Sequence, residues 1–215
     1  MGYSRCFLYT LHFKHHTILI MIKITRVGLF GGSFDPVHKG HIRLALLAKK
    51  EFRLNKVIFI PAYKPPHKAH KVLTSPSHRL KMLLLAVKKY PSLSVSSVEL
   101  DRKKAVYTYQ TLEHFSRACP KCDLFFIVGS DSLAEMDNWK KPAKILELSR
   151  LIVGRRRNAA APASKLGHER VFVLSGQIPP ASSSEIRKKI KAGQPYKTML
   201  PTTVHKHIKK HGLYI

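Results

Sequence analysis

The sequence has few acidic residues. Its 215 residues include 12 Asp and Glu against 39 Lys and Arg, which gives a formal net charge of +27. A charge so far from zero implies attraction to polyanions, so nucleic acid has to be considered as a partner. The basic residues are spread through most segments, however, without the interleaved aromatic side chains of a platform that stacks single-stranded nucleic acid. We therefore expect a solvated basic surface with a phosphate-binding cleft, and we do not expect nucleic acid as the partner.

Cysteine is also scarce, with three residues in the chain. An odd number without disulfide-like spacing is typical of reduced thiols, so we expect a protein of the cytoplasm. Cys119 and Cys122 have the spacing of half a zinc site, but no second Cys or His pair follows them, and a structural zinc site needs four ligands. We interpret this pair as part of a turn and expect no metal bound by protein side chains.

The sequence lacks an apolar run long enough to cross a membrane. His12, Lys14, His15 and His16 interrupt the apolar residues of segment 1–20, so this segment makes a poor signal peptide and a poor membrane span. We treat residues 1–21 as an N-terminal extension, with translation from Met21 as an alternative start, and expect no membrane partner. Because 44% of the residues are hydrophobic and 24% charged, residues 22–215 are expected to form a single packed domain.

The most informative stretch begins at Gly31 and joins an expected strand to an expected helix. Residues 24–30 are short, apolar and β-branched, as in a strand of a parallel sheet, whereas residues 42–48 have the apolar spacing of a helix. Gly31 and Gly32 let the backbone approach a ligand closely, and the start of the helix presents unpaired N–H groups and a positive dipole end. This arrangement predicts an anion-binding site.

Two histidines follow the glycines. His38 and His41 lie three positions apart at the start of the helix, so both can reach a phosphate held over the turn. An ordinary tight turn near two of the 13 histidines explains either feature alone. Taken together, the order of strand, GGSFDP, HxGH and helix resembles the signature of the nucleotidyltransferases with a Rossmann-like fold. The resemblance implies that both histidines are catalytic, and that ATP is bound by Gly31, Gly32, Ser33, Phe34, His38 and His41.

Strand and helix patterns alternate along the rest of the chain, which predicts an α/β fold. The fold implied by the resemblance is a Rossmann-like, doubly wound parallel sheet of five or six strands, flanked by helices. Strand patterns occur at residues 24–30, 56–61, 93–98, 123–128, 148–153 and 171–174.

A proline-rich loop at residues 62–76 contains the sequence PPHK. A proline pair keeps the backbone extended and limits the entropy lost when His67 and Lys68 close on an anion, although a solvated basic loop explains the residues equally well. The segment resembles the PPHK loop of nicotinate-nucleotide adenylyltransferases. That resemblance implies that His67 and Lys68 bind the substrate and that Lys68 is catalytic.

Two later segments resemble the substrate site of the same family. Tyr107 and Thr108 open a helix as in its SYT segment, where backbone groups meet the pyridine carboxylate, although residues 105–106 replace the usual small residues. Asp131 is by its position either a ribose ligand or a helix N-cap, or both. Trp139, the only tryptophan, has lysine neighbours that predict an exposed segment. The family stacks an aromatic side chain on the pyridine ring, and the residues that fit this pattern are Gly129, Asp131 and Trp139.

Residues 182–187 begin another expected helix. Its serines, followed by Glu185, form a capping signal, which alone explains the hydroxyl groups. The run also resembles the family's second nucleotide motif, Ile-Ser-Ser-Thr-x-Ile-Arg, with Ala181 and Ser184 in place of the isoleucine and the threonine. The resemblance implies that Arg187 is catalytic and that ATP phosphates are bound by Ser183, Ser184 and Arg187.

Residues 22–215 thus resemble a nicotinate-nucleotide adenylyltransferase in five ordered motifs. The resemblance implies transfer of AMP from ATP to nicotinate mononucleotide in NAD biosynthesis, by direct in-line attack, with Mg²⁺ carried by the ATP phosphates. Two alternatives stay open: a relative that uses another phosphate acceptor, such as phosphopantetheine, and a basic nucleic-acid-binding protein on the same fold. The sequence leaves open whether the chain forms a homo-oligomer.

Overall fold

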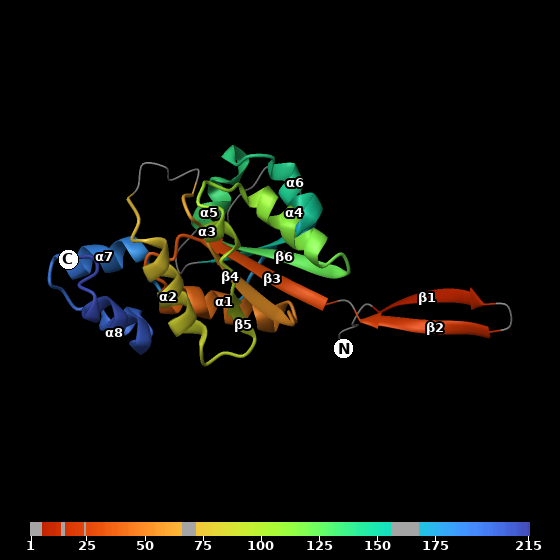
Figure 1. Cartoon of the computed structure of the whole chain (residues 1–215), viewed down its shortest axis with the longest axis horizontal. Coiled ribbons are helices and arrows are strands. Elements are labelled where there is room, and N and C mark those ends of the chain that lie inside the picture. Colours follow the sequence, from red (N-terminus) through yellow and green to blue (C-terminus); the bar gives the residue numbers. More distant parts are fainter. Residues whose placement is uncertain (1–5, 14–15, 24, 66–71, 156–167) are drawn as a thin grey trace.

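The computed structural model describes residues 6–13, 16–23, 25–65, 72–155 and 168–215. Its centre is a parallel six-stranded sheet with the strand order β5-β4-β3-β6-β7-β8 (Figure 1). The sheet grows outward in both directions from the neighbouring strands β3 and β6, which confirms the predicted doubly wound fold. The strands are β3 (Thr25–Gly32), β4 (Lys56–Pro61), β5 (Leu93–Val95), β6 (Cys122–Gly129), β7 (Arg150–Gly154) and β8 (Val171–Val173).

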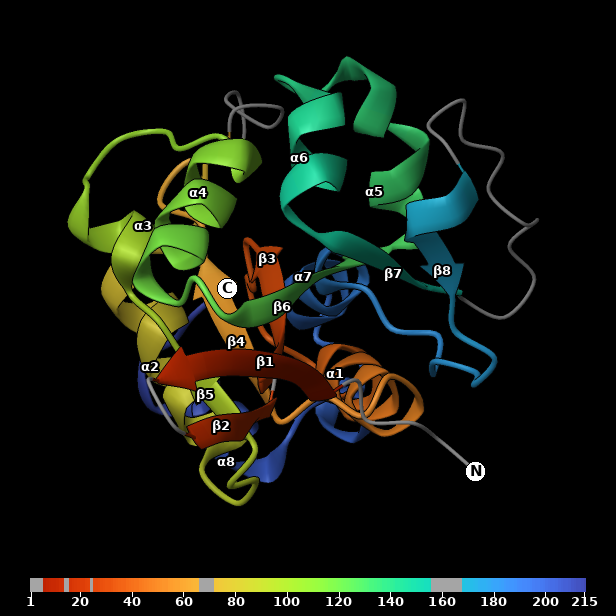
Figure 2. The ribbon, with the colours of Figure 1, turned by 90° about the vertical axis from the view of Figure 1, so that its right-hand side faces the viewer.

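Helices cover both faces of this sheet. Figure 2 shows α4, α5 and α6 on one side of it and α1, α2 and α8 on the other. The helices are α1 (Lys39–Glu51), α2 (Pro76–Val87), α3 (Val98–Asp101), α4 (Thr108–Ala118), α5 (Ser130–Ala134), α6 (Pro142–Leu148), α7 (Ser183–Lys191) and α8 (Thr202–Lys210), with short 3₁₀ turns η2 (Met136–Asn138), η3 (His168–Arg170) and η4 (Lys197–Met199).

The two faces of the sheet build two apolar cores. Alternate residues of β6 point to opposite faces, so Phe125 and Ile127 join the core beneath α1 and α2, whereas Phe126 and Val128 join the core beneath α4 to α6. Because both faces of the sheet are covered, the strand sequences are continuous runs of apolar residues. Such runs allowed the positions of the strands to be predicted.

The first strands of the chain stand apart from the sheet. β1 (Cys6–Phe13) and β2 (His16–Lys23) pair antiparallel with each other in a two-stranded sheet of their own. Figure 1 shows this hairpin extending away from the six-stranded sheet. The sequence pattern predicted an extension here without assigning strands to it. Its two apolar stretches, residues 7–11 and 18–20, lie within β1 and β2.

One predicted strand is shorter than expected. Residues 93–98 were predicted as a strand, but β5 ends at Val95 and the short helix α3 begins at Val98. Glu99 and Leu100, in a stretch of mostly polar and basic residues, are buried. Their burial depends on α3 packing against the sheet, which the local pattern does not reveal.

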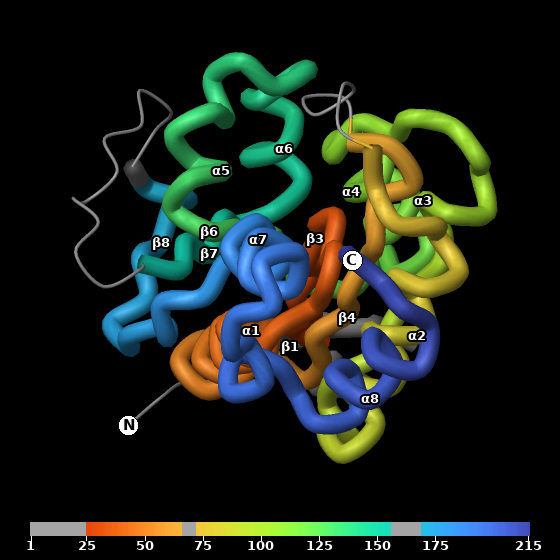
Figure 3. Tube along the Cα trace, turned by 90° about the vertical axis from the view of Figure 1, so that its left-hand side faces the viewer, coloured from red at the N-terminus to blue at the C-terminus, as the bar shows by residue number. Residues whose placement is uncertain are grey.

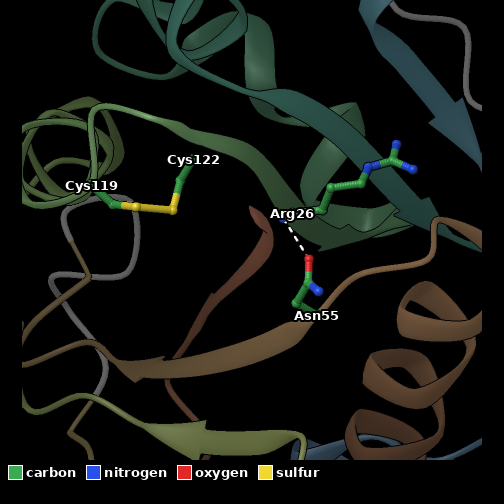
Figure 4. Close-up of a disulfide and its surroundings, with 4 residues drawn as sticks. All are labelled: Arg26, Asn55, Cys119 and Cys122. Carbon is green, nitrogen blue, oxygen red and sulfur yellow. Dashed lines mark hydrogen bonds between the residues drawn. A yellow bond between two sulfur atoms is a disulfide. The ribbon is translucent and has the colours of Figure 1, made fainter. Parts of the chain in front are cut away.

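The prediction of reduced cysteines is wrong for two of the three residues. Cys119 and Cys122 form a disulfide, with their Cα atoms 5.3 Å apart, between α4 and β6 (Figure 4). The turn itself is confirmed, because the backbone N–H of Cys122 donates to the carbonyl oxygen of Cys119. A tight turn brings two Cα atoms within the range that a disulfide needs, even at this short spacing. The cytoplasmic location argued from reduced thiols loses that support.

Among the described residues, no helix is both long and apolar enough to span a membrane.

Candidate active site

A cavity of about 810 Å³ lies at the carboxyl ends of the central strands. β3 and β6 are neighbours there, and they mark the point at which the strand order changes direction. In open α/β sheets this is where ligands bind. The start of α1, the start of α4, the segment after β6 and the start of α7 all contribute residues to the cavity, whose volume suits a nucleotide-sized ligand.

The turn between β3 and α1 forms one wall of this cavity. β3 extends through Gly32, so the two glycines end the strand and the turn follows them. Phe34 is buried behind the turn, with its ring edge-on to that of Phe30 at 5.3 Å between centroids. A Cβ atom at Gly40 would lie 3.0 Å from the imidazole of His38. The glycine of the HxGH motif therefore leaves room for the His38 ring.

The structure brings the two motif histidines together. Their rings stack with centroids 3.7 Å apart, and His38 is buried. The backbone N–H of His38 donates to Nδ1 of His41 at 3.2 Å. Since Nδ1 accepts this bond, a neutral His41 carries its proton on Nε2. His41 is thereby oriented as an Nε2–H donor next to the turn between β3 and α1, residues 33–38, which we call the phosphate turn after the site predicted there.

The start of α7 packs against the same turn. The Ser182 hydroxyl accepts a hydrogen bond from a backbone N–H in the first turn of α7 at 3.1 Å, as the capping signal predicted. Ser183 Oγ donates to the carbonyl oxygen of Pro36 at 2.9 Å, and Arg187 donates to that of Asp35 at 2.7 Å. Arg187 therefore joins the two predicted nucleotide motifs and also lines the cavity.

A second group of cavity residues surrounds the start of α4. Tyr107 occupies the N-cap position, and Thr108 is the first helical residue, so the helix opens where predicted. Trp139 also lines the cavity, and its indole lies edge-on to Phe126 with centroids 6.2 Å apart. The segment that carries Trp139 is exposed at Asn138 and Lys140, as predicted, but the indole itself is half-buried because it packs on β6.

Comparison with known proteins assigns this chain to a family. The sequence profile of the cytidylyltransferase-like family matches residues 29–189. A probable nicotinate-nucleotide adenylyltransferase of Clostridium tetani is 35% identical over 194 residues, which cover 86% of this chain and 97% of that protein. One from Thermus thermophilus is 39% identical over 190 residues, which cover 88% of this chain and 99% of that protein. The chain belongs to the nicotinate-nucleotide adenylyltransferase family.

A solved structure from this family has the same fold. The Plasmodium falciparum nicotinic acid mononucleotide adenylyltransferase complexed with NaAD superposes with a TM-score of 0.72 at 20% identity, and the match covers 88% of this chain and 97% of that one. The predictions of family and fold class are confirmed.

The proline-rich loop of this adenylyltransferase family member is described only at its two ends. His67 and Lys68 lie outside the described residues, so their roles stay predictions. Pro65, directly before the undescribed residues, and Leu73, two positions after them, both line the cavity.

Asp131 does not cap the helix that it was expected to cap. Gly129 is the N-cap of α5, and Asp131 is an exposed residue in the first turn of that helix. The N-cap interpretation is therefore wrong. Both residues line the cavity, and the ribose-binding role of Asp131 stays a prediction.

Glu99 is a cavity residue that sequence reasoning missed. It lies on α3, it is 8% exposed, and its Oε1 accepts a hydrogen bond from the Thr111 hydroxyl at 2.6 Å. Burial raises the pKa of Glu99 to about 7, against the opposing effects of Thr111 and Arg102. A carboxyl group in a polar, basic stretch gives no local signal of burial, because α3 is only four residues long.

Proposed function

We propose that this chain transfers AMP from ATP to nicotinate mononucleotide, forming deamido-NAD and pyrophosphate. The observation that carries the proposal is that one cavity is lined both by the phosphate turn with the start of α7 and by the start of α4 with Trp139. The first group suits a polyphosphate and the second a flat ring with an anionic substituent. The names of relatives 34% to 39% identical, and the NaAD bound to the Plasmodium enzyme, support this pair of substrates.

The reaction needs no protein nucleophile. A phosphate monoester is ionised near neutral pH, so an oxygen of the acceptor phosphate can attack the α-phosphorus of ATP directly. The new P–O bond forms in line as the bond to the bridging oxygen of the β-phosphate breaks, and pyrophosphate leaves with that electron pair. The work left to the chain is to align the two substrates and to neutralise charge.

The phosphate turn and α7 supply the groups for that work. We assign His41 Nε2–H, backbone N–H groups at the start of α1 and the Arg187 guanidinium to the ATP phosphates, with the buried His38 stacked on His41. Lys68, outside the described residues, stays a predicted fourth contributor. Each donor stabilises charge that increases on the leaving pyrophosphate.

We propose Mg²⁺ as the cofactor, bound through the phosphates of ATP. In the described part of the chain, no group of three or more His, Cys, Asp or Glu side chains could hold a metal ion. Asp35, in the phosphate turn, accepts hydrogen bonds from the Tyr214 hydroxyl at 2.7 Å and the Thr74 N–H at 3.2 Å. Both carboxylate oxygens of Asp35 thus accept hydrogen bonds from the chain itself. This arrangement fits a cation whose ligands come from the nucleotide and from water. When bound, Mg²⁺ neutralises negative charge on the phosphates.

Pyrophosphate release from ATP with a panel of acceptors tests the proposal. Nicotinate mononucleotide, its amide analogue and phosphopantetheine are compared side by side, and we expect the highest kcat/KM with nicotinate mononucleotide. A preference for phosphopantetheine would assign the chain to another branch of the fold. Salt-dependent binding to duplex nucleic acid, without pyrophosphate release from any acceptor, would instead support the nucleic-acid-binding alternative.

A further inference from the structure

Arg79 is the largest fully buried side chain, and it lies next to the cavity without lining it. It belongs to α2, a helix whose sequence pattern predicts only a core-facing role. Its guanidinium donates hydrogen bonds to the backbone carbonyl oxygens of Ala62 (2.7 Å), Ser33 (2.9 Å), Thr74 (2.9 Å) and Tyr63 (3.2 Å). A guanidinium presents five N–H donors in a rigid planar fork, so it holds these acceptors in a fixed arrangement.

The four acceptors come from three separate pieces of chain. Ser33 belongs to the phosphate turn, Ala62 and Tyr63 directly follow β4, and Thr74 precedes α2. The backbone N–H of Ala62 also donates to the Gly32 carbonyl oxygen at 2.9 Å. Arg79 therefore fixes the phosphate turn relative to both ends of the segment that carries the predicted acceptor-binding loop.

The charge of Arg79 is balanced by Asp35, which is also buried. Burial lowers the pKa of Arg79, whereas the charge of Asp35 acts to raise it, and the guanidinium keeps its charge. The Tyr214 hydroxyl donates to Asp35 Oδ1 at 2.7 Å, and burial followed by the Asp35 charge raises the pKa of Tyr214, which keeps this donor protonated. In the view of Figure 3 the C-terminal end of the chain lies in front of β3 and β4.

We propose that Arg79 is a positioning residue for adenylyl transfer, which aligns the phosphate turn with the ends of the acceptor-binding segment, and that Tyr214 holds its counter-ion Asp35 in place. The inference rests on the proposed function. Arg79 contacts backbone and not substrate, so it acts through the groups it holds. In-line attack requires the attacking oxygen and the α-phosphorus to be placed to within about 1 Å of the productive geometry, whereas the binding of each substrate alone tolerates a shifted neighbour. Losing Arg79 should therefore lower kcat more than it raises either KM.

The decisive variant is Arg79→Lys. Lysine keeps the charge that balances Asp35, but one ammonium group cannot reach four carbonyl oxygens at the positions that the planar fork serves. We expect kcat to fall by roughly 10- to 100-fold, while the KM values for ATP and nicotinate mononucleotide change by less than about threefold.

The matched control is Met82→Ala, one turn further along α2. Met82 is fully buried in the apolar core, does not line the cavity and carries no hydrogen-bond donor, so its truncation destabilises the same helix without removing any of the four hydrogen bonds that Arg79 makes. Circular dichroism gives the folded fraction of each variant, and kinetics are measured well below both unfolding midpoints. We expect Met82→Ala to keep the wild-type kcat. If Arg79→Lys loses activity only in proportion to its folded fraction, as Met82→Ala would, Arg79 is merely structural and the proposal fails.

Tyr214→Phe provides a second test that removes a single hydroxyl group. Like Arg79→Lys, it should lower kcat, here by roughly 3- to 10-fold, with both KM values nearly unchanged. Its control is Tyr196→Phe, which removes a hydroxyl group from a half-buried ring outside the cavity. If the wild type is active and neither Arg79→Lys nor Tyr214→Phe changes kcat, the positioning role is refuted while the proposed function stands. A wild type that releases no pyrophosphate with nicotinate mononucleotide would refute the proposed function and this inference with it.

Discussion

Among single residues, His41 has the most specific geometry for transition-state stabilisation. Because its Nδ1 accepts a backbone hydrogen bond, its Nε2–H is fixed as a donor. We expect His41→Ala to lower kcat by roughly 10²- to 10³-fold, the usual effect of removing one preorganised donor. Steady-state kinetics measure the loss, and circular dichroism should show that the fold survives. His114→Ala, at an exposed position on α4, should leave kcat unchanged. An unchanged kcat in His41→Ala would contradict the assigned role.

Glu99 makes a prediction about stability and pH. The pKa of Glu99 is raised to about 7 in the folded protein, whereas a glutamate in an unfolded chain has a pKa of about 4.3. Between these values the folded state keeps a proton that the unfolded state releases, so the free energy of unfolding falls as pH rises toward 7 and stays lower above it. The Glu99→Gln variant keeps an acceptor for Thr111 without this penalty.

Urea unfolding of Glu99→Gln at two pH values measures the effect. We expect the variant to be more stable than the wild type by on the order of 3 kcal/mol at a pH of about 8, and equal to it at a pH of about 4. Glu135→Gln, at an exposed position, should change stability by less than about 0.5 kcal/mol at both values. A stability difference for Glu99→Gln that does not depend on pH would show that Glu99 titrates normally.

At the scale of elements, α4 is expected to decide between the acid and amide forms of the acceptor. Tyr107 and Thr108 at its start line the cavity, and the N–H groups in the first turn of a helix stabilise an anion through hydrogen bonds and the helix dipole. The proposed substrate carries a ring carboxylate that the amide analogue lacks. We expect kcat/KM to favour the acid by at least about tenfold, equivalent to roughly 1.4 kcal/mol. Equal values would mean that residues 105–106 have reshaped the pocket.

Trp139→Ala is the companion experiment for the same pocket. Ring stacking serves the acid and the amide alike, so this variant should raise both KM values together and leave their ratio unchanged. A loss confined to one acceptor would mean that Trp139 contacts the carboxyl or amide group itself.

At the scale of the whole molecule, the catalytic unit is expected to lie in residues 22–215. Within the described parts of the chain, β1 and β2 pair with each other and with no strand of the six-stranded sheet. We therefore expect a protein that lacks residues 1–20 to keep its unfolding temperature and its kcat/KM nearly unchanged. Thermal unfolding and pyrophosphate release measure both. An insoluble or inactive truncated protein would show that the hairpin is part of the catalytic unit.

The sequence by itself determined the parallel α/β fold and the two nucleotide motifs. Both depend on patterns within a few residues: apolar runs that become strands covered on both faces, glycine where a side chain would collide with the His38 ring, and Ser182 at a helix start. The roles predicted for these residues still await the experiments above.

Only the tertiary structure decided the contacts between distant residues. The Asp35 carboxylate meets the Tyr214 hydroxyl across 179 positions, and Arg79 reaches Ser33 across 46. The burial of Glu99 and of Trp139 likewise depends on neighbours in space. A buried polar side chain is stable only where the fold supplies partners for its hydrogen bonds, and nothing in the adjacent sequence records which carbonyl or carboxylate those partners will be.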